Sequence, residues 1–414
     1  MSFDDTQINN KENAKSTHRR DSIRAFFYGI LESGWQTFAF IVAIRVFEAS
    51  EGIKSLIAAS GPIGFLLTPI TLYLFAQYRL KASLCCSLIY LITALCLLGA
   101  SFATSLTIFA ALLILSQIVN VQQGPVMLQI FTTSYPEHNR GHFMKIPHIL
   151  SATSAIAFGY IGGKILDNNI NNYPLIFLVM ALGALICARV IFKIPSIHFS
   201  RSHIGNPWQS ISLIWKDRLF GSMLGAWMLL GIGNLICLPI RYEYLANPKF
   251  GIDANNATIA IIMVAIPAIA KIASTYIWAN LFDKLKLMTT RNLLNGFFLM
   301  SVLLFFISDN ILLIALASAL QGIAIGGGKI FWSLWVTKIT NQELVSSYMS
   351  IHMALTGVRG SLAPFIGYWI LNQSNPQIVG YIGAFLIGVS MILFDLLKKN
   401  PRLLQESNKT DYAN

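Results

Sequence analysis

Several ionisable side chains of this sequence stand inside long apolar segments. Arg359 lies near the middle of the segment Tyr348–Asn372, Lys271 lies near the middle of an earlier one, and Glu32 is the carboxylate closest to the middle of any such segment. A helix that spans a bilayer needs about 20 mainly apolar residues, and an ionisable group at its centre costs roughly 2.5–3.5 kcal/mol on insertion scales. We therefore expect these side chains to face a polar cavity inside a helix bundle.

Polar residues also recur at helical spacing in these segments. His352, Thr356 and Arg359 follow one another at i, i+4 and i+7, which places them on one face of a helix. The segments 173–193, 289–308 and 378–397 are almost purely apolar, as expected for helices that lie against lipid. The candidate solute contacts predicted from these patterns are Glu32, Gln36, Asn120, Gln123, Lys271, Lys329, Trp332, His352 and Arg359.

The charges near mid-depth are unbalanced. Glu32 stands against Lys271, Arg359 and Lys329. Because unpaired ions in a low dielectric are costly, excess buried positive charge would be stabilised by an anionic ligand. We hypothesise a small organic anion: a carboxylate, or a phosphorylated or amino-acid-like solute. Protonation of Glu32 could couple its movement to a proton gradient.

Each candidate also has a structural alternative. Arg359 could bridge two helices through backbone carbonyls, and Lys271 could extend its amine toward the membrane surface. Lys329 could belong to a cytoplasmic gate. Glu32 could be a structural partner of a buried cation and not a proton carrier. His352 could be a helix contact, and the tryptophan at position 332 could serve packing alone.

Composition supports a membrane protein. The chain has 414 residues, of which 55% are hydrophobic and 12% are charged, about half the charge of a soluble domain. The net charge of +12 comes from basic residues in short loops, which fits the positive-inside rule better than nucleic-acid binding. The five cysteines lie in apolar segments without metal-ligand spacing, so we expect no disulfide, metal or cofactor.

The apolar segments predict an all-α integral membrane protein with twelve transmembrane helices. The predicted spans are 23–47, 52–75, 82–103, 105–131, 143–166, 173–193, 219–243, 256–282, 289–308, 311–337, 347–371 and 378–397. Most basic loop residues, Lys284 to Arg291 among them, fall on the side of the N-terminus, which predicts that both termini are cytoplasmic.

The chain is expected to divide into two six-helix repeats. We predict a disordered cytoplasmic N-terminus (1–22), a first bundle (23–194), a central cytoplasmic loop (195–218), a second bundle (219–398) and a cytoplasmic tail (399–414). A shift of about 205 residues places Phe143-Met144 on Tyr348-Met349, Ile161-Gly162 on Ile366-Gly367 and Ile165-Leu166 on Ile370-Leu371. Paired six-helix repeats around a central cavity are a known transporter plan.

Several short motifs carry a family resemblance. The stretch Ala279-Asn280-Leu281-Phe282-Asp283-Lys284 is close to the loop signature G-x-L-x-D-R, and its counterpart in the first half ends in Gln77-Tyr78-Arg79 without the acid. Gly159-Tyr160-Ile161-Gly162-Gly163 and Ala363-Pro364-Phe365-Ile366-Gly367 each keep half of a G-P-x-x-G-G motif, and Tyr135–Gly141 also fits. In these motifs the chain resembles the major facilitator superfamily.

The resemblance implies a secondary transporter that works by alternating access, in two bundles of six helices. It also implies gating roles for Asp283 and for Arg140 at the cytoplasmic side. Position 77, where the family has an acid, is a glutamine, so the gate is not expected to be symmetric. Import coupled to protons would make the protein a symporter.

Other classes of function remain open. A multidrug or metabolite exporter of the same fold is the main alternative, although acidic pockets suit lipophilic cations better than this basic one. A membrane-embedded lipid enzyme lacks the expected acid–base or metal motifs, and a receptor without flux would leave the buried charges unused. We expect a monomeric protein of a bacterial inner membrane whose partners are lipids, an anionic solute and protons, without nucleic acid.

Overall fold

The computed structural model describes residues 3–135, 140–199, 212–284, 286–340 and 342–403. These residues form helices and connecting turns, with one isolated antiparallel bridge between Lys81 and His198. The chain divides into two compact units. Unit 1 comprises residues 1–204 and 254–264, and unit 2 comprises residues 205–253 and 265–414.

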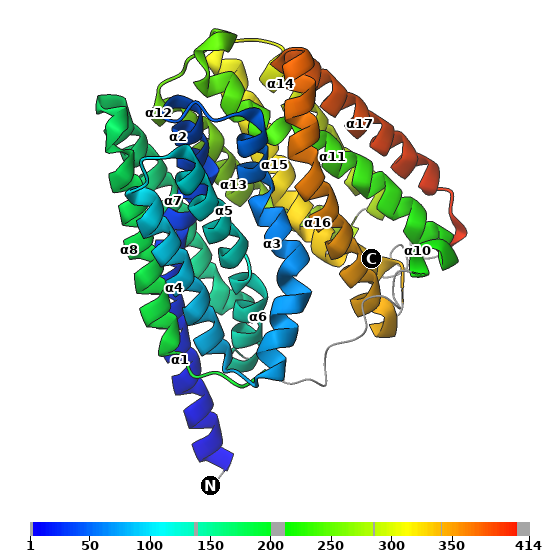
Figure 1. Ribbon diagram of the computed structural model, residues 1–414. Coiled ribbons are helices and arrows are strands. Elements are labelled where there is room, and N and C mark those ends of the chain that lie inside the picture. Colours follow the sequence, from blue (N-terminus) through cyan, green and yellow to red (C-terminus); the bar gives the residue numbers. More distant parts are fainter. Residues whose placement is uncertain (1–2, 136–139, 200–211, 285, 341, 404–414) are drawn as a thin grey trace. The chain divides into compact units, whose positions relative to one another are not determined.

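Unit 1 is built from long apolar helices joined by short turns. Its helices α4 and α8 pack along each other, and α1 packs against α7 and α8 (Figure 1). The elements of unit 1 are α1 (Phe3–Ser33), a π-helical turn (Gly34–Phe38), α2 (Ala39–Arg45), α3 (Glu51–Gln77), α4 (Ala82–Ser101), α5 (Leu106–Asn120), α6 (Gln123–Ser134), α7 (Arg140–Asn168), a 3-10 turn (Ile170–Asn172), α8 (Tyr173–Phe192) and α12 (Asn256–Ala260).

The N-terminal segment differs from the sequence expectation. We expected residues 1–22 to be disordered, but α1 begins at Phe3 and buries Thr17 and Asp21 completely or nearly so. Asp21 forms an ion pair with Arg24 at 2.7 Å, and both side chains are at most 10% exposed. The carboxylate of Asp21 is therefore paired inside unit 1, where a buried charge is costly without a partner.

Residues 254–264 pack within unit 1 although they precede helix α13 of unit 2. Asp167 accepts hydrogen bonds from the backbone amides of Asn256, at 2.7 Å, and Ala257, at 3.3 Å, at the first turn of α12. Arg45 donates to the side-chain oxygen of Asn256 at 2.6 Å. A Cβ on Gly163 would lie 2.5 Å from the Cα of Ala257, so the close approach of α7 and α12 requires glycine there.

Unit 2 repeats the architecture of long packed helices. Within it α11 packs against α16 and α17, and α15 packs against α13 and α14 (Figure 1). Its elements are α10 (Leu213–Lys216), α11 (Arg218–Ala246), a 3-10 turn (Pro248–Phe250), α13 (Ile266–Lys284), α14 (Leu287–Phe306), α15 (Ile311–Leu334), a 3-10 turn (Trp335–Lys338), α16 (Gln342–Gln373) and α17 (Pro376–Leu397). A π-helical turn (Ile261–Ala265) joins α12 to α13 at the boundary of the two units.

Asp217 ties several parts of unit 2 together. Its carboxylate accepts hydrogen bonds from the amides of Leu219 and Phe220, which begin α11. It also accepts hydrogen bonds from the hydroxyl of Tyr348 and from Arg402, all at 2.9 Å. Burial disfavours its charge, but these hydrogen bonds outweigh burial and hold the pKa of Asp217 below its usual value.

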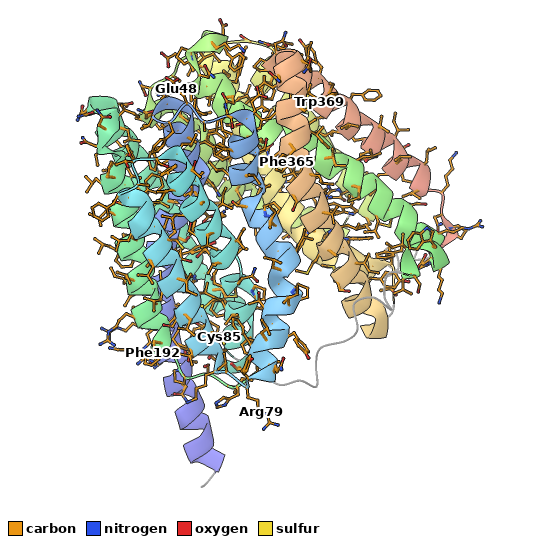
Figure 2. All side chains as sticks on the ribbon, in the orientation of Figure 1. Glu48, Arg79, Cys85, Phe192, Phe365 and Trp369 are labelled. Carbon is orange, nitrogen blue, oxygen red and sulfur yellow. The ribbon has the colours of Figure 1, made fainter. Side chains whose placement is uncertain are left out.

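The helices are suited to a bilayer. Among the described residues, eleven helices are long and apolar enough to cross a membrane by length and composition, and they coincide with eleven predicted spans to within about ten residues. The remaining predicted span, 347–371, lies in the 32-residue helix α16. Large apolar side chains such as Trp369 and Phe365 project outward from α16 (Figure 2), as expected for a surface in contact with lipid.

Candidate functional site

Trp227 of α11 is the centre of a buried basic and aromatic cluster in unit 2. Arg359 of α16 donates a hydrogen bond through Nη1 to the backbone oxygen of Trp227 and is 7% exposed. Its guanidinium lies directly against Gly231, where a Cβ would come within 2.4 Å of Cζ and Nε. Gly231 is therefore the residue of α11 that lets Arg359 lie between the two helices.

His352 joins the same cluster from one end of the predicted polar face of α16. Its ring centroid lies 5.0 Å from that of Trp227, 5.3 Å from Trp335 and 5.6 Å from Trp332. The structure thus brings together three of the predicted contacts, His352, Trp332 and Arg359. The Nε2 of His352 and the Nε of Arg359 are buried without a hydrogen-bond partner among the described residues.

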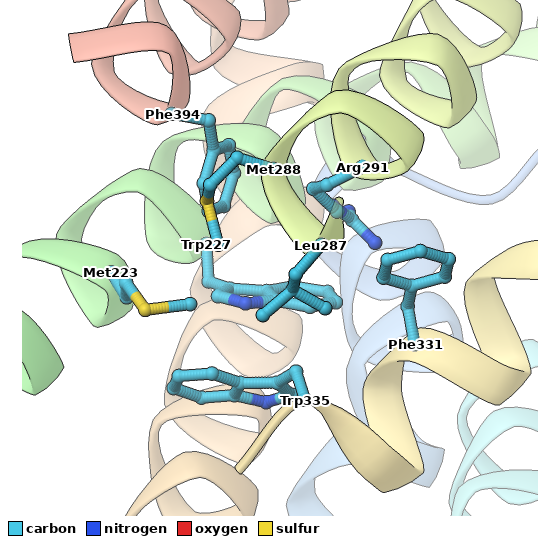
Figure 3. Close-up of a pocket in the computed structure, with 8 residues that line it drawn as sticks. All are labelled: Met223, Trp227, Leu287, Met288, Arg291, Phe331, Trp335 and Phe394. Carbon is cyan, nitrogen blue, oxygen red and sulfur yellow. The ribbon is translucent and has the colours of Figure 1, made fainter. Parts of the chain in front are cut away.

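Arg291 of α14 adds a second buried guanidinium, which sequence reasoning missed. Its Cζ lies 3.8 Å from the ring centroid of Trp227, and Phe331 and Phe394 stand further around it (Figure 3). The side chain lines a cleft of about 170 Å³ of empty space that is nowhere wide enough for a water molecule. Its Nε and Nη1 have no hydrogen-bond partner within the described part of the chain.

Arg291 lies at the start of the predicted span 289–308 and was counted only among the charges on the side of the N-terminus. Helix α14 already begins at Leu287, so Arg291 lies one turn inside the helix and is 2% exposed. The charges of Arg291 and Arg359 act on each other and on His352. Unit 2 therefore concentrates positive charge around Trp227, and neither arginine has an ion pair among the described residues.

Unit 1 carries a separate polar network around Gln123. Arg24 donates to the hydroxyl of Tyr90 at 3.2 Å, and that hydroxyl donates to Oε1 of Gln123, also at 3.2 Å. Gln36 donates to Glu32 one turn away at 3.5 Å; Glu32 is half-buried and Gln36 is exposed. The Arg24–Asp21 pair behind this network was not foreseen, because both residues lie at or beside the segment expected to be disordered.

The other predicted residues are placed individually. Asn120 ends α5, and its buried side-chain oxygen has no partner among the described residues. Lys271 is half-buried in α13, where Ser274 and Thr275 donate to its backbone oxygen. The side chains of Lys329, Asp283 and Arg140 lie outside the described residues, so their expected roles stay predictions.

Long apolar helices that enclose buried arginine and histidine side chains are typical of a polytopic membrane protein. The chain belongs to the Major Facilitator Superfamily, whose family model matches residues 25–311 and 242–411. It is accordingly a multi-pass integral membrane transporter and not an enzyme. The family resemblance seen in the sequence is confirmed.

Solved structures of transporters share this fold. The chain is similar to the nucleoside transporter NupG, with 14% identity and a TM-score of 0.74 over 94% of this chain and 99% of that one. It is similar to a D-xylose–proton symporter, with 12% identity and a TM-score of 0.67 over 92% and 96% of the two chains. A bacterial homologue of the human lysosomal transporter Spinster gives 12% identity and a TM-score of 0.65 over 96% and 98%. No curated protein matched the chain.

Proposed function

We propose that the protein carries a small organic anion across the membrane by alternating access, with Arg359 as the main contact for the negative charge. The observation behind this proposal is the buried guanidinium of Arg359, whose Nε has no hydrogen-bond partner among the described residues. Arg291 and His352 lie close enough to add to its field. A cation buried without a counter-charge is costly, and a bound anion would remove that cost.

The remaining predicted contacts are assigned by the same reasoning. Trp332 and His352 form the aromatic side of the site in unit 2, and Lys271 and Lys329 supply further positive charge. The polar face of unit 1 would consist of Glu32, Gln36, Asn120 and Gln123. Of these residues, Glu32 would carry the coupling proton. Asp283 and Arg140 would act in the cytoplasmic gate.

The distribution of charge supports a topology. Most basic loop residues fall on the side of the N-terminus, which by the positive-inside rule favours cytoplasmic locations for both termini. We assign the protein, as a monomer, to a bacterial inner membrane.

A thermal-shift screen on the purified protein tests the solute class. The panel contains the anions lactate, succinate, benzoate and glucose 6-phosphate, the neutral solutes uridine and D-xylose, and the lipophilic cation tetraphenylphosphonium. A solute at 100 times its Kd stabilises the folded state by about 2.7 kcal/mol, which gives a measurable shift. Shifts by anions support the proposal. Shifts confined to uridine or D-xylose contradict it, and a shift by tetraphenylphosphonium alone favours a multidrug exporter.

Uptake into proteoliposomes then tests the residues. Arg359→Gln should abolish uptake of the anion found in the screen while the folded protein is recovered in normal yield. Arg189→Gln, at an exposed position in the last turn of α8, is the matched control and should transport normally. Normal transport by Arg359→Gln would remove this residue from the mechanism. For Glu32→Gln, uptake that still responds to external pH would exclude Glu32 as the proton carrier.

A further inference from the structure

A chain of hydrogen bonds crosses three helices of unit 2 and ends at Asn234 of α11. Arg241 of α11 donates through Nη2 to the hydroxyl of Ser301, at 3.0 Å, and to Oε1 of Gln321, at 3.4 Å. Gln321 of α15 in turn donates through Nε2 to Oδ1 of Asn234 at 3.3 Å. Arg241 is 2% exposed and is held over the ring of Phe305, with its Cζ 4.6 Å from the ring centroid.

The chemistry of this chain sets the orientation of both amides. A guanidinium has five N–H donors and no acceptor, so the group of Gln321 that faces Arg241 must be its oxygen. The NH₂ group of Gln321 then points to Asn234, where only the side-chain oxygen can accept. The NH₂ group of Asn234 is consequently turned away from Gln321.

That NH₂ group is unused by the protein. Asn234 is half-buried, and its Nδ2 makes no hydrogen bond with any described residue. This atom is also not among the fully buried ones, so a ligand could reach it. A polar group in a membrane-spanning helix usually finds a partner, because leaving it unsatisfied is costly. The orientation imposed by Arg241 therefore presents two N–H donors in the middle of α11 without an acceptor for them.

Asn234 also stands close to the basic cluster. Trp227, Gly231 and Asn234 follow one another at i, i+4 and i+7 on α11, which places them on one face of the helix. Arg359 bonds to the first of these residues and lies against the second. Asn234 is thus one helical turn from the guanidinium proposed to contact the anion.

We propose that Asn234 is a specificity-determining residue of this site, which binds an acceptor oxygen of the solute through Nδ2. Arg241 and Gln321 are positioning residues that fix the amide in the donating orientation. The inference rests on the proposed function for the identity of the solute as an anion. Independently of the charge of the solute, the inference says that the part of the solute next to Asn234 carries a hydrogen-bond acceptor.

Gln321→Glu reverses the orientation and tests the idea. The new carboxylate still accepts from Arg241, but its second oxygen can only accept from Asn234, so Nδ2 turns inward and Oδ1 turns outward. We expect binding of succinate, measured by thermal shift against concentration, to weaken at least tenfold. The unliganded variant should melt at or above the temperature of the wild-type protein, because Arg241 gains a charged partner. If Gln321 had only a structural role, succinate affinity would change in the same direction as the melting temperature of the variant.

Two further variants complete the test. Asn234→Ala removes the two N–H donors from a half-buried position. It should weaken succinate binding about tenfold, and this effect does not depend on turning the Asn234 amide around. Gln377→Glu makes the same amide-to-carboxylate change on α17, where Gln377 donates to the hydroxyl of Tyr244, and should leave binding unchanged. Wild-type affinity for succinate in both Gln321→Glu and Asn234→Ala would overturn the proposal.

The result separates this inference from the proposed function. If uridine binds and succinate does not, the anion proposal fails, and uridine becomes the probe because it presents carbonyl oxygens to the same donors. Weaker uridine binding in Gln321→Glu and Asn234→Ala would then support the role of Asn234, and unchanged binding would refute it. Binding of tetraphenylphosphonium alone would overturn both proposals, since that cation has no acceptor.

Discussion

Replacing Arg291 with methionine should stabilise the protein, although it removes a side chain with several close contacts. The guanidinium is 2% exposed, lies 3.8 Å from the centre of the Trp227 ring and has two nitrogen atoms without hydrogen-bond partners among the described residues. Both nitrogen atoms are buried within the described part of the chain, so they do not exchange these hydrogen bonds with bulk solvent. Arg291 is thus a buried charge whose compensation comes from aromatic rings.

The balance of these terms sets the expected effect. The desolvated cation–π contact contributes about 2 kcal/mol, and it is lost in Arg291→Met. Each buried nitrogen left unsatisfied costs about 1–3 kcal/mol, and that cost is removed at two atoms. A thioether near the indole recovers about 0.3–1.5 kcal/mol. These terms sum to a gain of about 0.3–5.5 kcal/mol. Replacing buried ions by apolar side chains of similar size often stabilises proteins by about 1–4 kcal/mol, which lies inside this range.

Thermal unfolding in detergent measures this change. A gain of 1 kcal/mol in a domain of 150–250 residues raises the midpoint by about 2–4 °C, so Arg291→Met should melt several degrees above the wild-type protein at the same scan rate. Arg291→Lys keeps the charge but loses the flat group that stacks on Trp227, so it should melt below the wild type. Melting of Arg291→Met below the wild type would refute the reasoning, because it would mean that the guanidinium has a partner stronger than the aromatic rings.

Two further changes test other parts of the structure. The depressed pKa of Asp217 means that its contribution to stability is fully present above its unfolded-state pKa of about 3.9 and is lost as the pH falls through the lower folded-state value. Melting temperatures between pH 3 and 7 should therefore depend less on pH in Asp217→Asn, and an unchanged pH profile would show that its bonds with Arg402 and α11 contribute little. Gly163→Ala forces a methyl group against the backbone of Ala257 and should destabilise the protein by about 1–3 kcal/mol. Gly124→Ala, with open space around the new carbon, should have little effect, and equal effects of the two changes would contradict the packing argument.

The fold was largely predictable from the sequence because the bilayer imposes a simple rule. Backbone groups in hydrocarbon must be satisfied within the segment, so a run of about 20 apolar residues has to be a helix. The helix bounds accordingly agree with the predicted spans at most ends. The largest exception is polar: α1 begins at Phe3, well before the predicted span, and its buried ion pair between Asp21 and Arg24 is not visible in a hydropathy profile.

The candidate site was predictable only where polar residues repeat along one helix. His352, Thr356 and Arg359 share a face of α16, and the structure places His352 and Arg359 in one cluster. Arg291 escaped detection because it lies one turn inside α14, where an arginine reads as the basic flank of a loop. Trp227 gave no signal, since a tryptophan in an apolar segment is most often a packing residue.

The position of Arg359 depends on a residue that has no side chain. Gly231 leaves the space on α11 that the guanidinium occupies, and the backbone oxygen of Trp227 satisfies one of its donors. Neither feature neutralises the charge, and the other ionisable side chains around Trp227, namely Arg291 and His352, are themselves basic. On the proposed function, a helix pair that encloses a cation so closely and supplies only a neutral acceptor would gain stability from a bound anion. This difference between the empty and the occupied site is what a transporter needs in order to select its solute by charge.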